Sequence, residues 1–158
     1  MVIVSDTSAI SNLYQIGQID ILRALFGIIT IPPAVKREID VIPAQKEGIE
    51  NISWISVATP TNQQFVNELT EEIDLGEAEA IALSIEQHAA YLIIDKYVGR
   101  RIADEYGVRI VGLLGILIQA KQQGIIMAVK PHIEALRKLG FRLNQTLVTS
   151  VLKQLDEI

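Results

Sequence analysis

Residues 2–8 are Val-Ile-Val-Ser-Asp-Thr-Ser, and residues 91–95 are Tyr-Leu-Ile-Ile-Asp. Each stretch begins with a short run of large apolar residues and reaches an aspartate directly, which is typical of a buried parallel strand. Ser, Thr and Asp accept hydrogen bonds from the free N–H groups at a helix start, so residues 5–8 also predict that a helix follows the first strand. The two stretches predict a sheet of parallel strands.

The rest of the chain alternates between strand-like and helix-like segments. We predict an α/β fold, in which a parallel β-sheet is flanked by α-helices on both faces as a three-layer α/β/α sandwich. Residues 41–51 contain Pro43 and Gly48 and are predicted to form a loop. Further strands are expected at residues 28–31, 52–57 and 108–111, and helices at residues 10–14, 19–26, 34–40, 61–69, 76–87, 97–106, 113–123, 131–139 and 145–155.

Length and composition indicate one globular domain. The chain has 158 residues, of which 49% are hydrophobic and 21% are charged. We expect residues 1–145 to form the domain and residues 146–158 to form a C-terminal helix packed on it. The mean hydropathy of +0.31 is high for a monomer. We therefore expect an apolar helix face to be buried in a homodimer or against another protein.

Charge and cysteine content exclude several classes of function. The net charge of −5 argues against a protein that coats nucleic acid through a basic surface, but less against a nuclease, whose metal-binding carboxylates are themselves acidic. The absence of cysteine excludes disulfides, zinc thiolates and thiol catalysis. No basic leader precedes the first apolar run, and no apolar run reaches the roughly 20 residues of a membrane span. The expected location is the cytoplasm, with no membrane association.

The strand-end aspartates are the first candidates for chemistry. In parallel sheets, ligands bind beyond the carboxyl ends of the strands, so Asp6 and Asp95 would share one crevice if their strands are neighbours. Unpaired charges next to buried strands are unfavourable, and a hard cation such as Mg²⁺ or Mn²⁺ would relieve them. Glu77 and Glu79 in the first turn of a helix, and Glu38 on an earlier helix, could reach the same crevice. Such a cluster suits metal-assisted hydrolysis of a phosphodiester bond.

The order of these motifs resembles the PIN-domain nucleases. Asp6-Thr7-Ser8 after the first strand looks like the opening of a PIN domain, and Asp95 with the helix after it looks like the late aspartate of that family. Residues 76–80, Gly-Glu-Ala-Glu-Ala, are similar to the acidic helix start of the related flap endonucleases. Residues 114–124 and 140–143 resemble a prokaryotic PIN-like family of uncharacterised proteins close to the VapC toxins. The resemblance covers about residues 2–145.

The resemblance implies a metal-dependent ribonuclease, an RNA substrate and a possible pairing with a small antitoxin protein. Carried over position by position, the catalytic and metal-binding acids fall on Asp6, Glu38, Glu77 or Glu79, and Asp95, while Thr7 or Ser8 would orient a metal-bound water or a phosphate. The chain departs from the pattern in two places. It offers two glutamates where toxin relatives usually carry an aspartate, and it has Lys96 where they often carry another acid, so that a fixed positive charge could replace a second metal ion.

Each candidate also has an ordinary structural role. Asp6 could serve only as a helix cap, and Asp95 could cap the helix that begins at Tyr97. Glu77 and Glu79 could complement a helix dipole, and Glu38 could lie on a solvated helix face. Lys96, Arg100 and Arg101 could hold RNA phosphates, although Arg100 and Arg101 could instead pair with Asp104 or Glu105.

Four other classes of function are alternatives to a nuclease. A PIN-like protein that has lost catalysis and acts as a binding or scaffold protein is the main alternative. A phosphotransfer signalling domain would need a second acid beside Asp6, and a haloacid-type phosphatase would need an aspartate at position 8, where this chain has serine. A dinucleotide enzyme would need a Gly-x-Gly-x-x-Gly motif after a strand, which the chain lacks.

Overall fold

Five short strands lie side by side in a single sheet at the centre of the molecule. In the computed structural model, which describes all residues 1–158, their order is β3-β2-β1-β4-β5 and every pair is parallel. The predicted α/β fold with a parallel sheet is therefore confirmed. The strands are β1 (Ile3–Ser5), β2 (Ile29–Ile31), β3 (Ile55–Val57), β4 (Tyr91–Ile93) and β5 (Ile110–Val111).

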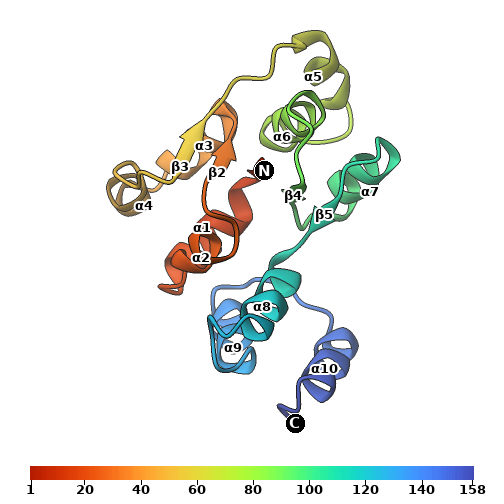
Figure 1. The fold of residues 1–158 in the computed structure, drawn as a ribbon. Helices are drawn as coiled ribbons and strands as arrows, with labels where there is room; N and C mark the ends of the chain where they lie inside the picture. Colours follow the sequence, from red (N-terminus) through yellow and green to blue (C-terminus); the bar gives the residue numbers. More distant parts are fainter.

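Ten helices connect and cover the strands (Figure 1). Parallel strands cannot be joined by tight turns, so a crossover segment must lie between each pair. The helices are α1 (Thr7–Gln15), α2 (Asp20–Phe26), α3 (Pro33–Asp40), α4 (Pro43–Ile49), α5 (Gln63–Leu69), α6 (Leu75–Glu86), α7 (Tyr97–Glu105), α8 (Leu113–Gln122), α9 (Lys130–Lys138) and α10 (Gln145–Gln154).

The sheet separates two apolar cores. Figure 1 shows α5, α6 and α7 on one side of the strands, and α1, α2, α8 and α9 on the other. Successive side chains of a strand point to opposite faces, so Ile3 joins the core beneath α1, α2 and α8, and Val4 joins the core beneath α6. In the same way Ile93 belongs to the first core and Leu92 to the second. β1 and β2 are buried throughout, which explains why their residues are mostly apolar.

The predicted loop at residues 41–51 is wrong, because α4 forms there. Pro43 stands in the first turn of α4, where its fixed φ and missing N–H suit a helix start. A Cβ at Gly48 would collide with the phenol of Tyr14 on α1, so the glycine permits close packing of the two helices. Pro43 and Gly48, which predicted a loop, therefore start α4 and allow it to pack closely against α1.

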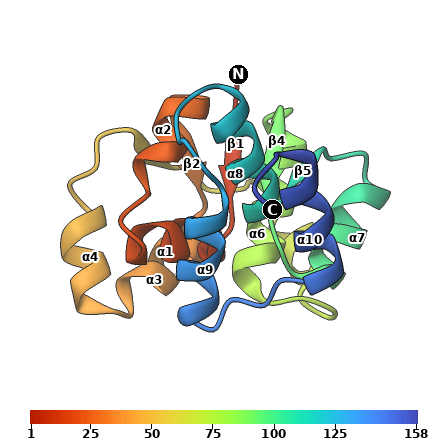
Figure 2. The ribbon, with the colours of Figure 1, turned by 90° about the horizontal axis from the view of Figure 1, so that it is seen from below.

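The C-terminal helix belongs to the first core. Val148 and Leu152 of α10 are buried there, and Figure 2 shows α8, α9 and α10 together in front of the strands. The last residues are also held in place, since Glu157 accepts hydrogen bonds from the backbone N–H groups of Val129 and Lys130 at the start of α9. None of the helices has the length and apolar character needed to span a bilayer.

Candidate active site

The two strands that lead to aspartates are direct neighbours. β1 pairs with β4 so that Ser5 lies opposite Ile93, and the backbone N–H of Asp6 donates to the carbonyl of Ile93 over 3.0 Å. Asp6 and Asp95 therefore follow adjacent parallel strands at the same edge of the sheet. The condition for bringing the two aspartates to one edge, that their strands are neighbours, is therefore met.

Asp6 combines a helix cap with a buried charge. It is only 4% exposed, and its Oδ1 accepts a hydrogen bond from the N–H of Ala9 in the first turn of α1. Burial, followed by the nearby charge of Asp95, raises the pKa of Asp6 to about 7. A cap alone would lower the pKa, because an N–H donor favours the ionised form. The environment of Asp6 thus lacks the positive charge that would keep a carboxylate ionised.

Glu77 is the second buried acid at this edge. Asp74 caps α6, and its Oδ1 accepts from the N–H of Glu77 over 2.9 Å. The Glu77 side chain is only 6% exposed, and its Oε1 is buried without a hydrogen-bond partner. Burial, followed by the charge of Asp74, raises the pKa of Glu77. An unpaired buried carboxylate oxygen is unfavourable, and the nearest cationic group, Lys96 Nζ, is 4.0 Å away.

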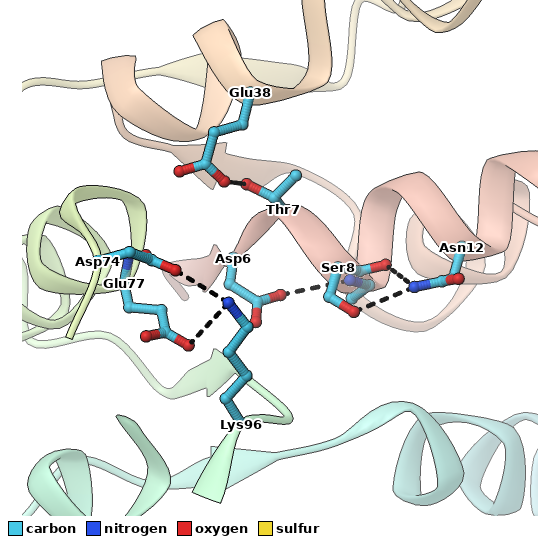
Figure 3. Close-up of polar contacts among 9 residues, drawn as sticks. Asp6, Thr7, Ser8, Asn12, Glu38, Asp74, Glu77 and Lys96 are labelled. Carbon is cyan, nitrogen blue, oxygen red and sulfur yellow. Dashed lines mark hydrogen bonds and ion pairs between the residues drawn. The ribbon is translucent and has the colours of Figure 1, made fainter. Parts of the chain in front are cut away.

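Glu38 reaches the same edge from α3. The hydroxyl of Thr7 donates to Glu38 Oε2 over 2.5 Å, so a residue of α1 and a residue of α3 are joined at the rim. A Cβ at Gly76 would collide with the Glu38 carboxylate, so the glycine at the start of α6 leaves the space that this side chain occupies. Figure 3 shows Glu38 and Thr7 on the opposite side of Asp6 from Lys96.

Asp95 lies close to Asp6 but points toward α8. Its two carboxylate oxygens accept from the N–H of Leu113 at 3.1 and 3.3 Å, so Asp95 caps α8 and not the helix that begins at Tyr97. Burial raises the pKa of Asp95, while the N–H of Leu113 and the charge of Arg100 act in the opposite direction. The charge of Asp95 acts on Asp6, but Asp95 does not line the pocket that contains Asp6, so the expectation that the two aspartates share one crevice is wrong.

Glu79 is directed away from the other acids. It is buried, and its Oε1 accepts from the N–H of Ala34 over 2.9 Å at the start of α3. Pro32 precedes this helix and supplies no side-chain cap, so Glu79 provides the missing acceptor. Of the two glutamates that the sequence left as alternatives, Glu77 therefore faces the site and Glu79 has a structural role.

The predicted phosphate-binding residues are divided between two places. Lys96 faces the acids, and its Nζ donates to Asp74 Oδ2 over 2.9 Å. Arg100 instead donates to the carbonyl of Ile94, and Arg101 pairs with Glu105 at 2.9 Å and Glu72 at 3.4 Å. The alternative pairing of Arg101 with Glu105 is thus present, and neither arginine lines the acidic site.

An open polar pocket of about 230 Å³ lies at the sheet edge, lined by nine residues that include Asp6, Glu38 and Glu77. No apolar residue lines it, which suits a charged ligand and disfavours an apolar one. Sequence reasoning missed Asp74, although Asp74 and Glu77 have the spacing of a helix cap and its third-position acid. It also missed Ser11 and Asn12, which have no motif of their own and are one helical turn beyond Thr7 and Ser8. The full lining is Asp6, Thr7, Ser8, Ser11, Asn12, Glu38, Asp74, Glu77 and Lys96.

The donors of this pocket fit a hard divalent cation. No three carboxylates or histidines are already spaced to hold a metal ion together. Magnesium, however, is usually held by one or two carboxylates and keeps several water ligands. Asp6 and Glu77 are two buried carboxylates with raised pKa values, and Glu77 Oε1 lacks a partner. They are the residues that would hold the cation.

Comparison with known proteins agrees with this geometry. The family model DUF3368, described as PIN domain, matches residues 2–157. The match includes every residue of the pocket and all five strands. A search of curated proteins gave no match.

Proposed function

Because the chain belongs to the PIN-domain family, whose members are generally nucleases, we propose that it is a divalent-metal-dependent endoribonuclease that hydrolyses RNA phosphodiester bonds. The observation that carries the proposal is the pair of buried acids in the pocket: the pKa of Asp6 is raised to about 7, and Glu77 Oε1 has no hydrogen-bond partner. A bound Mg²⁺ or Mn²⁺ would supply an activated water and offset charge on the phosphate.

The other pocket residues have roles that their contacts suggest. Thr7 holds Glu38 at the rim, so that Glu38 can accept a proton from an incoming water or bind an outer water of the cation. Ser8 receives hydrogen bonds from Asn12 at both its hydroxyl and its carbonyl, which keeps its side chain oriented in the first turn of α1. Lys96 is the one basic residue of the pocket and is suited to contact the RNA phosphate. The backbone N–H groups at the start of α1 favour an anion at the same place.

Cleavage of a mixed-sequence RNA in Mg²⁺ or Mn²⁺, with EDTA as the blank, tests the proposal. We expect wild-type protein to cleave only with metal, and Asp6→Asn and Glu77→Gln to lose both cleavage and Mn²⁺ binding. Asp104→Asn is the matched control, because Asp104 is an exposed acid on α7 outside the pocket and should leave both properties unchanged. Undiminished cleavage in EDTA, or by Asp6→Asn, would contradict the proposal.

A non-catalytic binding or scaffold protein is the second candidate. The observation that favours it is the ion pair of Lys96 with Asp74 inside the pocket, which already neutralises one acid. The same Mn²⁺ titration separates the two candidates. A scaffold protein would bind no metal ion and cleave no RNA, whereas a nuclease would do both.

We also propose that the protein is the toxin-like component of a toxin–antitoxin pair and forms a homodimer. The resemblance to VapC-type toxins supports the first proposal, and the mean hydropathy of +0.31 supports the second. An apolar groove of about 530 Å³ between β5, α8 and α10 is the candidate contact surface. Leu147 lines it and is half exposed. Light scattering tests the homodimer and should give a dimer for wild type and a monomer for Leu147→Asp. The toxin role is tested by expressing the protein in its host: we expect growth to stop, and co-expression of a small protein encoded by the neighbouring gene to restore it.

A further inference from the structure

Lys96 is the only cation among the acids of the pocket. It precedes α7 at the end of the segment that follows β4, and its side chain is largely exposed. Its ammonium is 2.9 Å from Asp74 Oδ2 and 4.0 Å from Glu77 Oε1. Figure 3 shows it approaching Asp74 and Glu77 from the side opposite to Glu38. A lysine side chain is ordinarily protonated near neutral pH, so Lys96 carries a positive charge.

The two sides of the pocket differ in how well their acids are satisfied. Asp74 is fully engaged, with Oδ1 on the N–H of Glu77 and Oδ2 on Lys96. Glu77 Oε1 has no hydrogen-bond partner, and Lys96 is too distant to supply one at 4.0 Å. The Asp6 carboxylate accepts from the backbone N–H of Ala9 and forms no ion pair. The two buried acids of the pocket, Asp6 and Glu77, therefore have no hydrogen bond from a cationic side chain.

We propose that Lys96 is a built-in cation on the Asp74 side of the pocket, and that it limits the pocket to one divalent ion, held by Asp6 and Glu77. This inference rests on the proposed metal-dependent function. Asp74 is already bound to the ammonium, so an ion at Asp74 would have to displace Lys96. Repulsion by the ammonium is also stronger at Asp74, whose Oδ2 is 2.9 Å from Nζ, than at Glu77, whose Oε1 is 4.0 Å away.

Counting bound Mn²⁺ tests the inference independently of RNA cleavage. Free Mn²⁺ gives an electron paramagnetic resonance signal that is lost on binding, so a titration yields the number of ions per chain. We expect one ion for wild type, two for the neutral variants Lys96→Met and Lys96→Gln, and one for Lys96→Arg, which keeps the charge. Lys36→Met is the matched control, since Lys36 is also paired with an aspartate, Asp40, but lies outside the pocket. It should bind one ion, as wild type does.

The outcomes separate this inference from the proposed function. If wild type and both neutral Lys96 variants all bind one ion, the inference is overturned while metal dependence stands. Two ions in wild type would also overturn it. If wild type binds none, metal dependence fails, and the one-ion limit fails with it. Circular dichroism of each variant shows whether it is folded, so that a changed number of bound Mn²⁺ ions is not caused by unfolding. Two neutral variants are used so that the result does not depend on one substitution.

Discussion

Glu79 of α6 and Ala34 of α3 are joined by a buried hydrogen bond of 2.9 Å, in which the backbone N–H of Ala34 donates to the carboxylate. The bond fixes the start of the helix that carries Glu38. Glu79 and Glu77 are both glutamates and are two positions apart, but Glu79 stabilises the start of α3 and does not line the pocket.

Replacement of Glu79 should therefore affect stability more than metal binding. Glu79→Ala leaves the buried N–H of Ala34 without an acceptor, which we expect to lower the free energy of unfolding by about 1–3 kcal/mol. Glu79→Gln keeps an acceptor oxygen and should have a smaller effect. Urea denaturation measures both. Mn²⁺ binding should survive in Glu79→Gln and be lost in Glu77→Gln, and the reverse pattern would show that the roles of the two glutamates are exchanged.

Asp6 should make the metal-free protein less stable as the pH rises. Its ordinary pKa is 3.8, and burial with the charge of Asp95 raises it to about 7 in the fold. The folded protein thus keeps a proton that the unfolded chain releases between these values. The stability that this proton contributes is complete below pH 3.8 and is lost as the pH rises toward 7. The loss amounts to roughly 4 kcal/mol over about three pH units.

Asp6→Asn removes this titration and supplies the measurement. In EDTA, we expect Asp6→Asn to gain stability relative to wild type as the pH is raised from 4 to 8, as followed by urea denaturation. Asp104→Asn, which replaces an exposed acid outside the pocket, is the control variant. Saturating Mn²⁺ should stabilise wild type and reduce the difference. If the difference in the free energy of unfolding between wild type and Asp6→Asn does not change with pH, the fold does not raise the pKa of Asp6.

Gly112 provides the space for the side chains of Asp95 and Arg100 beside α8. A Cβ at this position would lie 2.6 Å from Asp95 Oδ1 and 2.8 Å from Arg100 Nη1. Because Asp95 is held by the N–H of Leu113, it cannot move freely, and we expect Gly112→Ala to lower the free energy of unfolding by about 1–3 kcal/mol.

A double-mutant cycle shows whether the carboxylate is the cause. In the Asp95→Ala background the same glycine substitution should be less destabilising, and urea denaturation of the four proteins measures the difference. Equal effects in both backgrounds would locate the strain elsewhere, in the helix start itself.

Glu157 holds the C-terminal segment against α8 and α9. It accepts from Lys121 Nζ at 2.8 Å and from the N–H groups of Val129 and Lys130 at 2.9 and 2.8 Å. Glu157→Ala should lower the free energy of unfolding by about 1–3 kcal/mol. The hydrogen bond from Lys121 and the bonds from Val129 and Lys130 lower the pKa of Glu157, so its contribution should be present above pH 4.5 and disappear as the pH falls further. A thermal melt of wild type and Glu157→Ala at pH 3 and pH 7 checks both expectations.

Much of the site could be predicted because its main signals are local. An acid that follows an apolar strand must lie at the sheet edge, which placed Asp6 and Asp95 correctly. The direction of a side chain on a helix is different, because it depends on which neighbour the helix packs against. The roles of Asp74 and Glu79, and the engagement of Arg100 with the carbonyl of Ile94, depended on contacts between distant segments.

The sequence by itself determined a parallel sheet with two aspartates at one edge, since apolar periodicity and strand-end residues are properties of short segments. Only the tertiary structure decided that Glu77 enters the pocket while Glu79 caps α3. Side chains two positions apart on a helix diverge by roughly 200°, so one of them had to turn away. The packing of α6 against α3 decided that Glu79 turned away, because its carboxylate accepts from the backbone N–H of Ala34. Glu77 Oε1 has no such partner and lies in the pocket.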